Sequence, residues 1–181
     1  MAMPAFHATQ FDAAVAGLIL PNGLRLASVK VAFPSPVVQV NPFFLQEGTV
    51  AEIEAVVEAA DIEAYLNQRQ PSGMSNFSVK ASGGLLTVVA TAKVVIPVQV
   101  GAEGTLAFAD GRLNFVPTRA EVGGVKMPDG MMREQLNKVN PIIDSTGYPV
   151  DVTVKAIAIE EGAVRLAGSA AVTAPIPRRE P

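Results

Sequence analysis

Apolar and polar residues alternate along most of the chain, and the longest unbroken alternation spans residues 86–100. Every even-numbered position of this run is apolar, whereas the odd-numbered positions include Thr87, Thr91, Lys93 and Gln99. Successive side chains of a β-strand point to opposite faces, so a period of two places all the even positions on one side. The run therefore predicts a central strand with one buried face.

The alternation continues on both sides of this run, at residues 77–81 and 106–115. The second stretch contains Asp110-Gly111, and Asp-Gly between two alternating segments is typical of a type I′ hairpin, because both turn residues then need a positive φ. Residues 77–122 are thus predicted to form an antiparallel meander. Similar alternation predicts strands at 24–33 and 38–40, and a C-terminal hairpin with arms at 150–158 and 164–167.

Apolar residues follow helical spacing in two places. Residues 129–139 predict a helix with Asp129 as the N-cap and with Met132, Leu136 and Val139 on one face. Residues 9–20 predict a short N-terminal helix that ends at Pro21.

The segment 49–67 fits two interpretations. As one helix it has a capping box formed by Thr49 and Glu52, and its many Ala and Glu residues favour helix. As a strand followed by a helix, residues 51–57 alternate and the helix begins near Ala60. The residue pattern by itself favours neither interpretation. With either one, the elements amount to an α+β fold built on an antiparallel sheet.

The composition suits a fold whose core consists mainly of Val, Ala, Leu and Ile. Hydrophobic residues make up 49% of the 181 positions, aromatic residues only 6%, and Trp is absent. This length fits a single domain, which we expect to cover residues 1–174 and to be followed by a flexible Pro/Arg-rich tail at 175–181. A net charge of −3 argues against a nucleic-acid-binding protein, which needs clustered Lys and Arg.

The residues needed for common active sites are scarce. The chain has no Cys, and its single histidine is His7, so Ser-His, Cys-His and zinc-based sites of the usual kinds cannot be assembled. One group of acidic residues is interpreted as a solvated surface rather than an acid/base pair or cation site: Glu52, Glu54, Glu58, Asp61 and Glu63. We predict a protein that is not an enzyme and needs no metal or cofactor.

Residues 1–20 lack the basic start of a secretory signal and are too short and weakly apolar to span a membrane. We therefore expect a protein that is cytoplasmic or peripheral to the inner membrane. A chain whose export signal had been removed would look the same and would belong to the periplasm or the cell envelope.

The order and spacing of several segments resemble the LmeA-like family of bacterial phospholipid-binding proteins over about residues 49–172. The segments that carry the resemblance are residues 60–67, 77–80, 84–86 and 96–98, Asp110-Gly111-Arg112-Leu113, Met127-Pro128 and residues 140–144. The resemblance implies a highly curved antiparallel meander sheet wrapped around two or three short helices, like the tubular lipid-binding superfamily. It also implies phospholipid binding without catalysis, and it favours a strand followed by a helix at 49–67.

Two functions fit these observations. In the first, an apolar groove of the curved sheet holds a phospholipid or another acyl-chain ligand, in support of lipid transfer or envelope maintenance and with peripheral membrane contact. An acyl chain gains about 0.8 kcal/mol for each buried CH₂, so no polar motif is needed for affinity. The residues expected to contact the lipid are Leu86, Val88, Val94, Ile96, Val98, Phe108 and Phe115.

In the second, the protein is a structural or assembly subunit that self-associates or joins a larger assembly through its apolar surface and termini, with Phe43 and Phe44 as interface anchors. An ordinary packed core in place of a groove is the alternative to both functions.

Overall fold

The computed structural model describes residues 5–7, 9–40, 43–45, 48–93, 96–146, 148 and 150–173, with the backbone alone described at 5–7, 37–40, 43–45 and 72. The predicted tail at 175–181 lies outside these ranges. The elements in chain order are β1 (Ala5–His7), β2 (Phe11–Ile19), β3 (Arg25–Phe33), β4 (Val37–Val40), β5 (Phe43–Leu45), β6 (Val50–Glu58), α1 (Ala59–Arg69), a 3₁₀ turn (Pro71–Gly73), β7 (Met74–Ser82), β8 (Leu85–Lys93), β9 (Pro97–Ala109), β10 (Arg112–Val122), β11 (Val125–Lys126), α2 (Asp129–Val139), β12 (Ile143–Asp144), β13 (Val150–Glu160) and β14 (Ala163–Val172).

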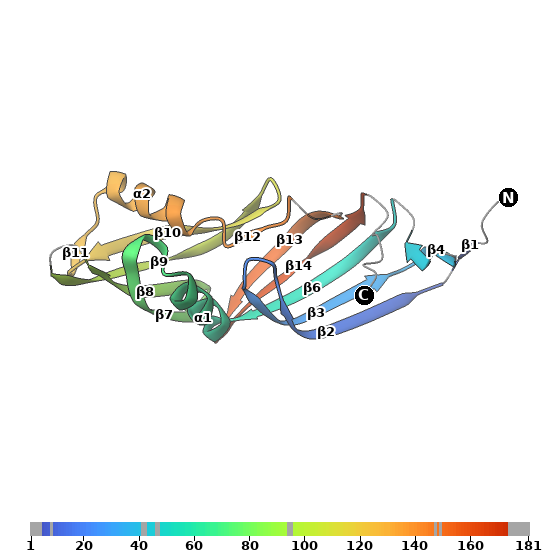
Figure 1. Ribbon diagram of the computed structural model, residues 1–181, viewed down its shortest axis with the longest axis horizontal. Coiled ribbons are helices and arrows are strands. Elements are labelled where there is room, and N and C mark those ends of the chain that lie inside the picture. The colour runs from blue at the N-terminus through green and yellow to red at the C-terminus, as the bar shows by residue number, and fades with distance from the viewer. Residues whose placement is uncertain are drawn as a thin grey trace.

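The described strands form two large antiparallel sheets and a small one (Figure 1). The six-stranded sheet is a meander in the order β11-β10-β9-β8-β7, with β12 also paired to β10. The five-stranded sheet has the order β13-β14-β6-β3-β2, and the small sheet the order β1-β4-β5. The predicted meander and C-terminal hairpin are confirmed.

The prediction of one highly curved sheet wrapped around the helices is wrong, because both large sheets are open and neither is strongly curled. A sheet need not close when its edge strands are covered in another way. Here α1 lies along the edge strand β7, and Glu63 of α1 accepts a hydrogen bond from the backbone N–H of Val79 at 2.9 Å. Side chains of a helix therefore satisfy backbone groups that closure of the sheet would otherwise have to satisfy.

The long alternation at 86–100 is two strands and not one. The chain turns between β8 and β9, and Ile96 in this turn is 68% exposed. Even positions nevertheless face even positions across the hairpin, since Val88 pairs with Ala102 and Ala90 pairs with Val100. Directly paired residues lie on the same side of a sheet. The predicted apolar face is therefore real, but it is spread over two neighbouring strands.

Local turn chemistry accounts for the next hairpin. Asp110 and Gly111 link β9 to β10 with φ values of 51° and 72°, as a type I′ turn requires. The helix α2 also agrees with its predicted bounds, although Asp129 is not the N-cap. Pro128 precedes the helix in an extended conformation, and no side chain caps it.

Tertiary pairing decided the two segments for which helix and strand competed. The segment 49–67 is strand β6 followed by α1, and β6 lies in the middle of its sheet, paired with β3 and β14. The predicted helix at 9–20 is wrong, because this segment is the edge strand β2 and pairs with β3 from Phe11↔Phe33 to Ile19↔Arg25. In both cases, backbone bonding and apolar contacts with neighbouring strands outweigh a short local helical pattern.

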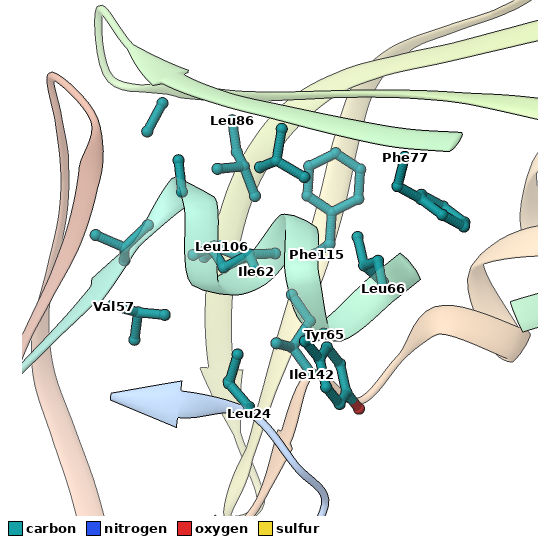
Figure 2. Packing of buried hydrophobic residues seen from close by; sticks show 14 of the residues in the cluster. Leu24, Val57, Ile62, Tyr65, Leu66, Phe77, Leu86, Leu106, Phe115 and Ile142 are labelled. Carbon is teal, nitrogen blue, oxygen red and sulfur yellow. The ribbon is translucent and has the colours of Figure 1, made fainter. Parts of the chain in front are cut away.

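The hydrophobic core lies where α1 meets both large sheets. The buried residues of α1 are Ala59, Ile62, Tyr65 and Leu66. Figure 2 shows Ile62 and Leu66 among strand side chains that include Leu86 and Phe115 of the six-stranded sheet. Val57 and Val164 of the five-stranded sheet belong to the same cluster. One core thus joins the two sheets.

Candidate functional site

An asparagine anchors α1 to the six-stranded sheet. The side-chain amide of Asn67 donates to the carbonyl oxygen of Phe77 at 2.9 Å, and its oxygen accepts from the Phe77 backbone N–H at 2.8 Å. An amide side chain that bonds both backbone groups of one residue replaces the strand that would otherwise pair there. Because α1 also buries four residues, it is held firmly against β7.

A second asparagine anchors α2 in the same way. The Phe115 backbone N–H donates to Asn140 Oδ1 at 2.9 Å, and Asn140 Nδ2 donates to the Phe115 carbonyl oxygen at 2.9 Å. Asn140 follows the last residue of α2, whereas no residue of α2 itself is buried. The helix is therefore fixed at its C-terminal end and only lightly packed along its length.

An apolar cavity of about 80 Å³ lies between the two helices and strands β7 to β10. Its walls come from α1, from β7, from the inner face of β8, β9 and β10, and from α2 with its flanking residues. Only Tyr65, through its hydroxyl, and Gln135 of α2 bring polar side-chain atoms to the residues that line it, and none of the lining residues is charged. The residues that line it are Ile62, Tyr65, Leu66, Met74, Phe77, Leu86, Val88, Ala90, Val100, Ala102, Phe115, Pro117, Ala120, Met127, Met132, Gln135, Leu136, Val139 and Ile142.

The structure brings three of the predicted lipid contacts together in this cavity: Leu86, Val88 and Phe115. Val98 and Phe108 are half-buried on strand β9 but do not line the cavity. Ile96 lies exposed in the turn before β9, where the chain leaves the apolar face. Val94 lies outside the described residues.

The two aromatic residues expected at a protein interface lie on β5, where Phe43 pairs with Val40 and Phe44 pairs with Gln39. Their side chains lie outside the described part of the chain. The assembly function therefore stays a prediction from the sequence.

Sequence reasoning did not place the helices in this site. The spacing of Met132, Leu136 and Val139 already indicated one apolar face on α2, and all three residues line the cavity. Spacing shows that a helix has an apolar face, but it does not show which sheet that face contacts. The pairing of this face with Ile62 and Leu66 of α1 across the cavity depends on tertiary structure alone.

The described ion pairs lie outside the cavity. Nη1 of Arg25 on β3 donates to both carboxylate oxygens of Asp61 on α1, at 2.9 and 3.1 Å, which ties α1 to the five-stranded sheet. The hydrogen bond to Asp61 and the charge of this carboxylate raise the pKa of Arg25 above its ordinary value. Polar groups thus hold the walls in place from outside, while the interior stays apolar.

Among the described residues, no group of three or more His, Cys, Asp and Glu side chains could hold a metal ion. No described helix is long and apolar enough to cross a membrane. What the cavity offers a ligand is apolar surface, with one amide at Gln135.

Replacing Asn140 by alanine is expected to loosen α2 selectively. The change leaves the N–H and C=O of Phe115 without their side-chain partner, at a cost of about 1–3 kcal/mol of folding free energy. Because α2 has no buried residue, its amide hydrogens should exchange faster than in the unmodified protein, while those of α1 keep their protection. Hydrogen exchange read by mass spectrometry checks this, and equal acceleration in both helices would contradict it.

Comparison with known proteins gives one family match. The family model described as LmeA-like phospholipid-binding matches residues 7–169. No curated protein and no solved structure matches the chain.

Proposed function

Because the chain belongs to the LmeA-like phospholipid-binding family, we propose that it binds a phospholipid without catalysis, with an acyl chain in the cavity between α2 and the six-stranded sheet. The family match covers nearly the whole described chain and confirms the resemblance seen in the sequence. The match extends further towards the N-terminus than the resemblance, which began at about residue 49. Such binding would suit a protein that transfers lipids or maintains an envelope, because the protein shields the acyl chain of the lipid from water in transit.

The observation that carries this proposal is the contrast between the apolar lining of the cavity and the light packing of α2. Met132, Leu136 and Val139 of α2 line the cavity, yet none of them is buried. Apolar side chains that stay partly exposed in the free protein gain free energy when an acyl chain covers them, at about 25 cal/mol for each Å² removed from water. An acyl chain that contacts α2 therefore gains free energy, and α2 is only lightly packed when no ligand is bound.

The size of the cavity indicates how the ligand enters. About 80 Å³ is well below the roughly 300–1,000 Å³ typical of sites for small organic ligands. An acyl chain therefore fits only if a wall moves. The wall that can move at least cost is α2, because α1 is held by four buried residues, by Asn67 and by the ion pair to Arg25.

Two neighbouring methionines of α2 provide a matched test. Met132 lines the cavity, whereas Met131 is 48% exposed and does not line it. Met132→Glu is expected to weaken phospholipid binding by at least about tenfold, since a carboxylate beside an acyl chain loses hydration without gaining a partner. Met131→Glu carries the same change of charge and helix propensity, and it should bind as the unmodified protein does.

Binding is measured by displacement of a phospholipid with a fluorescent acyl chain, and lipid retained after purification is measured by native mass spectrometry. Both variants should melt close to the unmodified protein, because both positions are partly exposed. Equal affinity in the two variants, or no phospholipid binding by any of the three proteins, would refute the proposed site.

A further inference from the structure

The five-stranded sheet has one face that is apolar across all five strands. In one row, Ala13 of β2 faces Val31 of β3, which faces Ile53 of β6, and the row continues through Gly168 of β14 to Val154 of β13. The next row along the strands runs through Val15, Val29, Ala55, Leu166 and Ile157. Directly paired residues point to the same side, so these ten residues define what we call the long apolar face.

The opposite face of the same sheet is polar. Its corresponding row runs through Asp12, Ala32, Glu52, Ser169 and Thr153, and the next row contains Lys30 and Glu54. A sheet with one polar and one apolar face normally covers the apolar face with other parts of a protein or with a ligand.

The described helices leave much of the long apolar face open. In Figure 1 both helices lie toward the six-stranded sheet, and the five-stranded sheet extends away from them. Val15 is 48% exposed, and Val31, Ile53 and Val154 are only partly buried. Val31 and Ile53 lie on interior strands, where such exposure is unusual for branched apolar side chains.

The long apolar face is continuous with the walls of the cavity. Val29, Leu166 and Ile157, which form most of its second row, pack against the core cluster. The same cluster contains Phe77, Leu86 and Phe115, which line the cavity. One cluster of apolar side chains in contact therefore extends from the walls of the cavity to the five-stranded sheet.

The dimensions of this face suit an acyl chain. Each row of this face crosses five strands that lie about 4.8 Å apart, so it spans roughly 19 Å. One leaflet contributes about half of the roughly 30 Å hydrocarbon core of a bilayer, so a phospholipid chain needs about 15 Å. The cavity of about 80 Å³ holds only a small part of a two-chain lipid, and the adjoining face has room for more of it.

We infer that the long apolar face is a second acyl-chain surface, which holds one chain of the phospholipid whose other chain enters the cavity beneath α2. This inference rests on the proposed function and names where the rest of the same ligand lies. A second copy of the protein and the surface of a bilayer are the other two candidates for covering this face. The continuity with the cavity favours one lipid across both surfaces, and the net charge of −3 disfavours docking to an anionic bilayer.

The test uses a phospholipid with a photoreactive diazirine on each of its two acyl chains, loaded onto the full-length protein. After the one-to-one complex has been separated from vesicles and irradiated, the labelled peptides are identified by mass spectrometry. We expect adducts on β3, β6 and β14 in addition to adducts on α2 and β8. Adducts confined to the walls of the cavity would overturn the inference and leave the proposed function intact, whereas no retained lipid would overturn both.

Two neighbouring residues of β3 provide the matched variants. Val31 lies on the long apolar face, and Ala32 lies on the polar face between Asp12 and Glu52. Val31→Lys should reduce adducts on β3, β6 and β14 by about tenfold, because the ammonium group cannot be desolvated beside a hydrocarbon chain, and should retain adducts in the cavity. Ala32→Lys should change neither set, since the new ammonium group lies beside two carboxylates.

Two controls test whether a second copy of the protein or a membrane surface covers the long apolar face instead of the lipid chain. A dimer in light scattering that dissociates in Val31→Lys, without adducts on the five-stranded sheet, would assign the face to a second copy and overturn the inference. Adducts on this sheet that occur only while intact vesicles are present would assign it to a membrane surface, with the same consequence. Melting temperatures near that of the unmodified protein show that both variants are folded, as expected at partly exposed positions.

Discussion

Replacing Gly104 by alanine is expected to destabilise the protein by about 3 kcal/mol or more. Gly104 lies on β9 opposite Pro117, where the register of the β9–β10 pair shifts between Pro117 and Arg119. A Cβ atom on Gly104 would lie 2.2 Å from the carbonyl oxygen of Val116 and 2.6 Å from Cα of Pro117. Both are backbone atoms, so a rotamer change cannot relieve the overlap and the two strands must separate.

Gly101 on the same strand is the matched control. Its backbone does not have a positive φ, and a Cβ built on it meets no heavy atom within 4 Å. Gly101→Ala should therefore leave stability unchanged or raise it by up to about 1 kcal/mol, because alanine restricts the unfolded chain. Urea denaturation of the two variants measures the difference. Equal stability of Gly104→Ala and Gly101→Ala would contradict the expected overlap between a Cβ at position 104 and the backbone of β10.

The close approach of the backbone at Gly104 has a counterpart in the other large sheet. Gly168 on β14 faces Val154, where the register of the β13–β14 pair shifts between Val154 and Ala156. A Cβ there would lie 2.0 Å from the carbonyl oxygen of Thr153. Glycine opposite a β-bulge in each sheet lets the strands bend locally while the remaining ladder stays paired.

Replacing Asn67 by alanine is expected to cost about 2–4 kcal/mol of folding free energy. The side chain of Asn67 satisfies both the N–H and the C=O of Phe77 on the edge strand β7, in a part-buried environment. Alanine leaves both backbone groups without this partner at the edge that α1 covers. Because α1 is part of the hydrophobic core, the loss should lower the cooperative unfolding midpoint of the whole protein and not just that of the helix.

An exposed asparagine of α2 provides the control for this change. Asn137 is solvent-exposed, so Asn137→Ala should be neutral or slightly stabilising, since alanine is the better helix former. Thermal unfolding followed by circular dichroism compares the two variants. A midpoint for Asn67→Ala that matches that of Asn137→Ala would contradict the anchoring role of Asn67.

The two asparagines explain how a stable fold can contain a movable wall. Asn67 and Asn140 make the same pair of bonds, to Phe77 and Phe115 respectively. Asn67 holds a helix with four buried residues, whereas Asn140 holds the end of a helix with none. The cavity therefore lies between one rigid and one lightly held helix, which is the arrangement that the proposed lipid binding requires.

The sequence by itself determined the elements whose signals are local. A positive φ at Asp110 and Gly111 is a property of those two residues, and it placed the β9–β10 hairpin. The apolar spacing of residues 129–139 placed α2, and the alternation after residue 150 placed the C-terminal hairpin. The order of short segments was enough to identify the family, because spacing along a chain does not depend on how the chain is packed.

The tertiary structure decided every feature that depends on which partner a segment meets. Residues 86–100 have the predicted apolar face. The turn within them pairs even positions with even positions, so the alternation of period two continues through it and does not reveal it. Residues 9–20 became an edge strand because β3 offered a partner. The cavity combines helix faces and strand faces more than 60 residues apart in the chain, as from Ile62 to Leu136, and their meeting is a matter of long-range packing that no local pattern encodes.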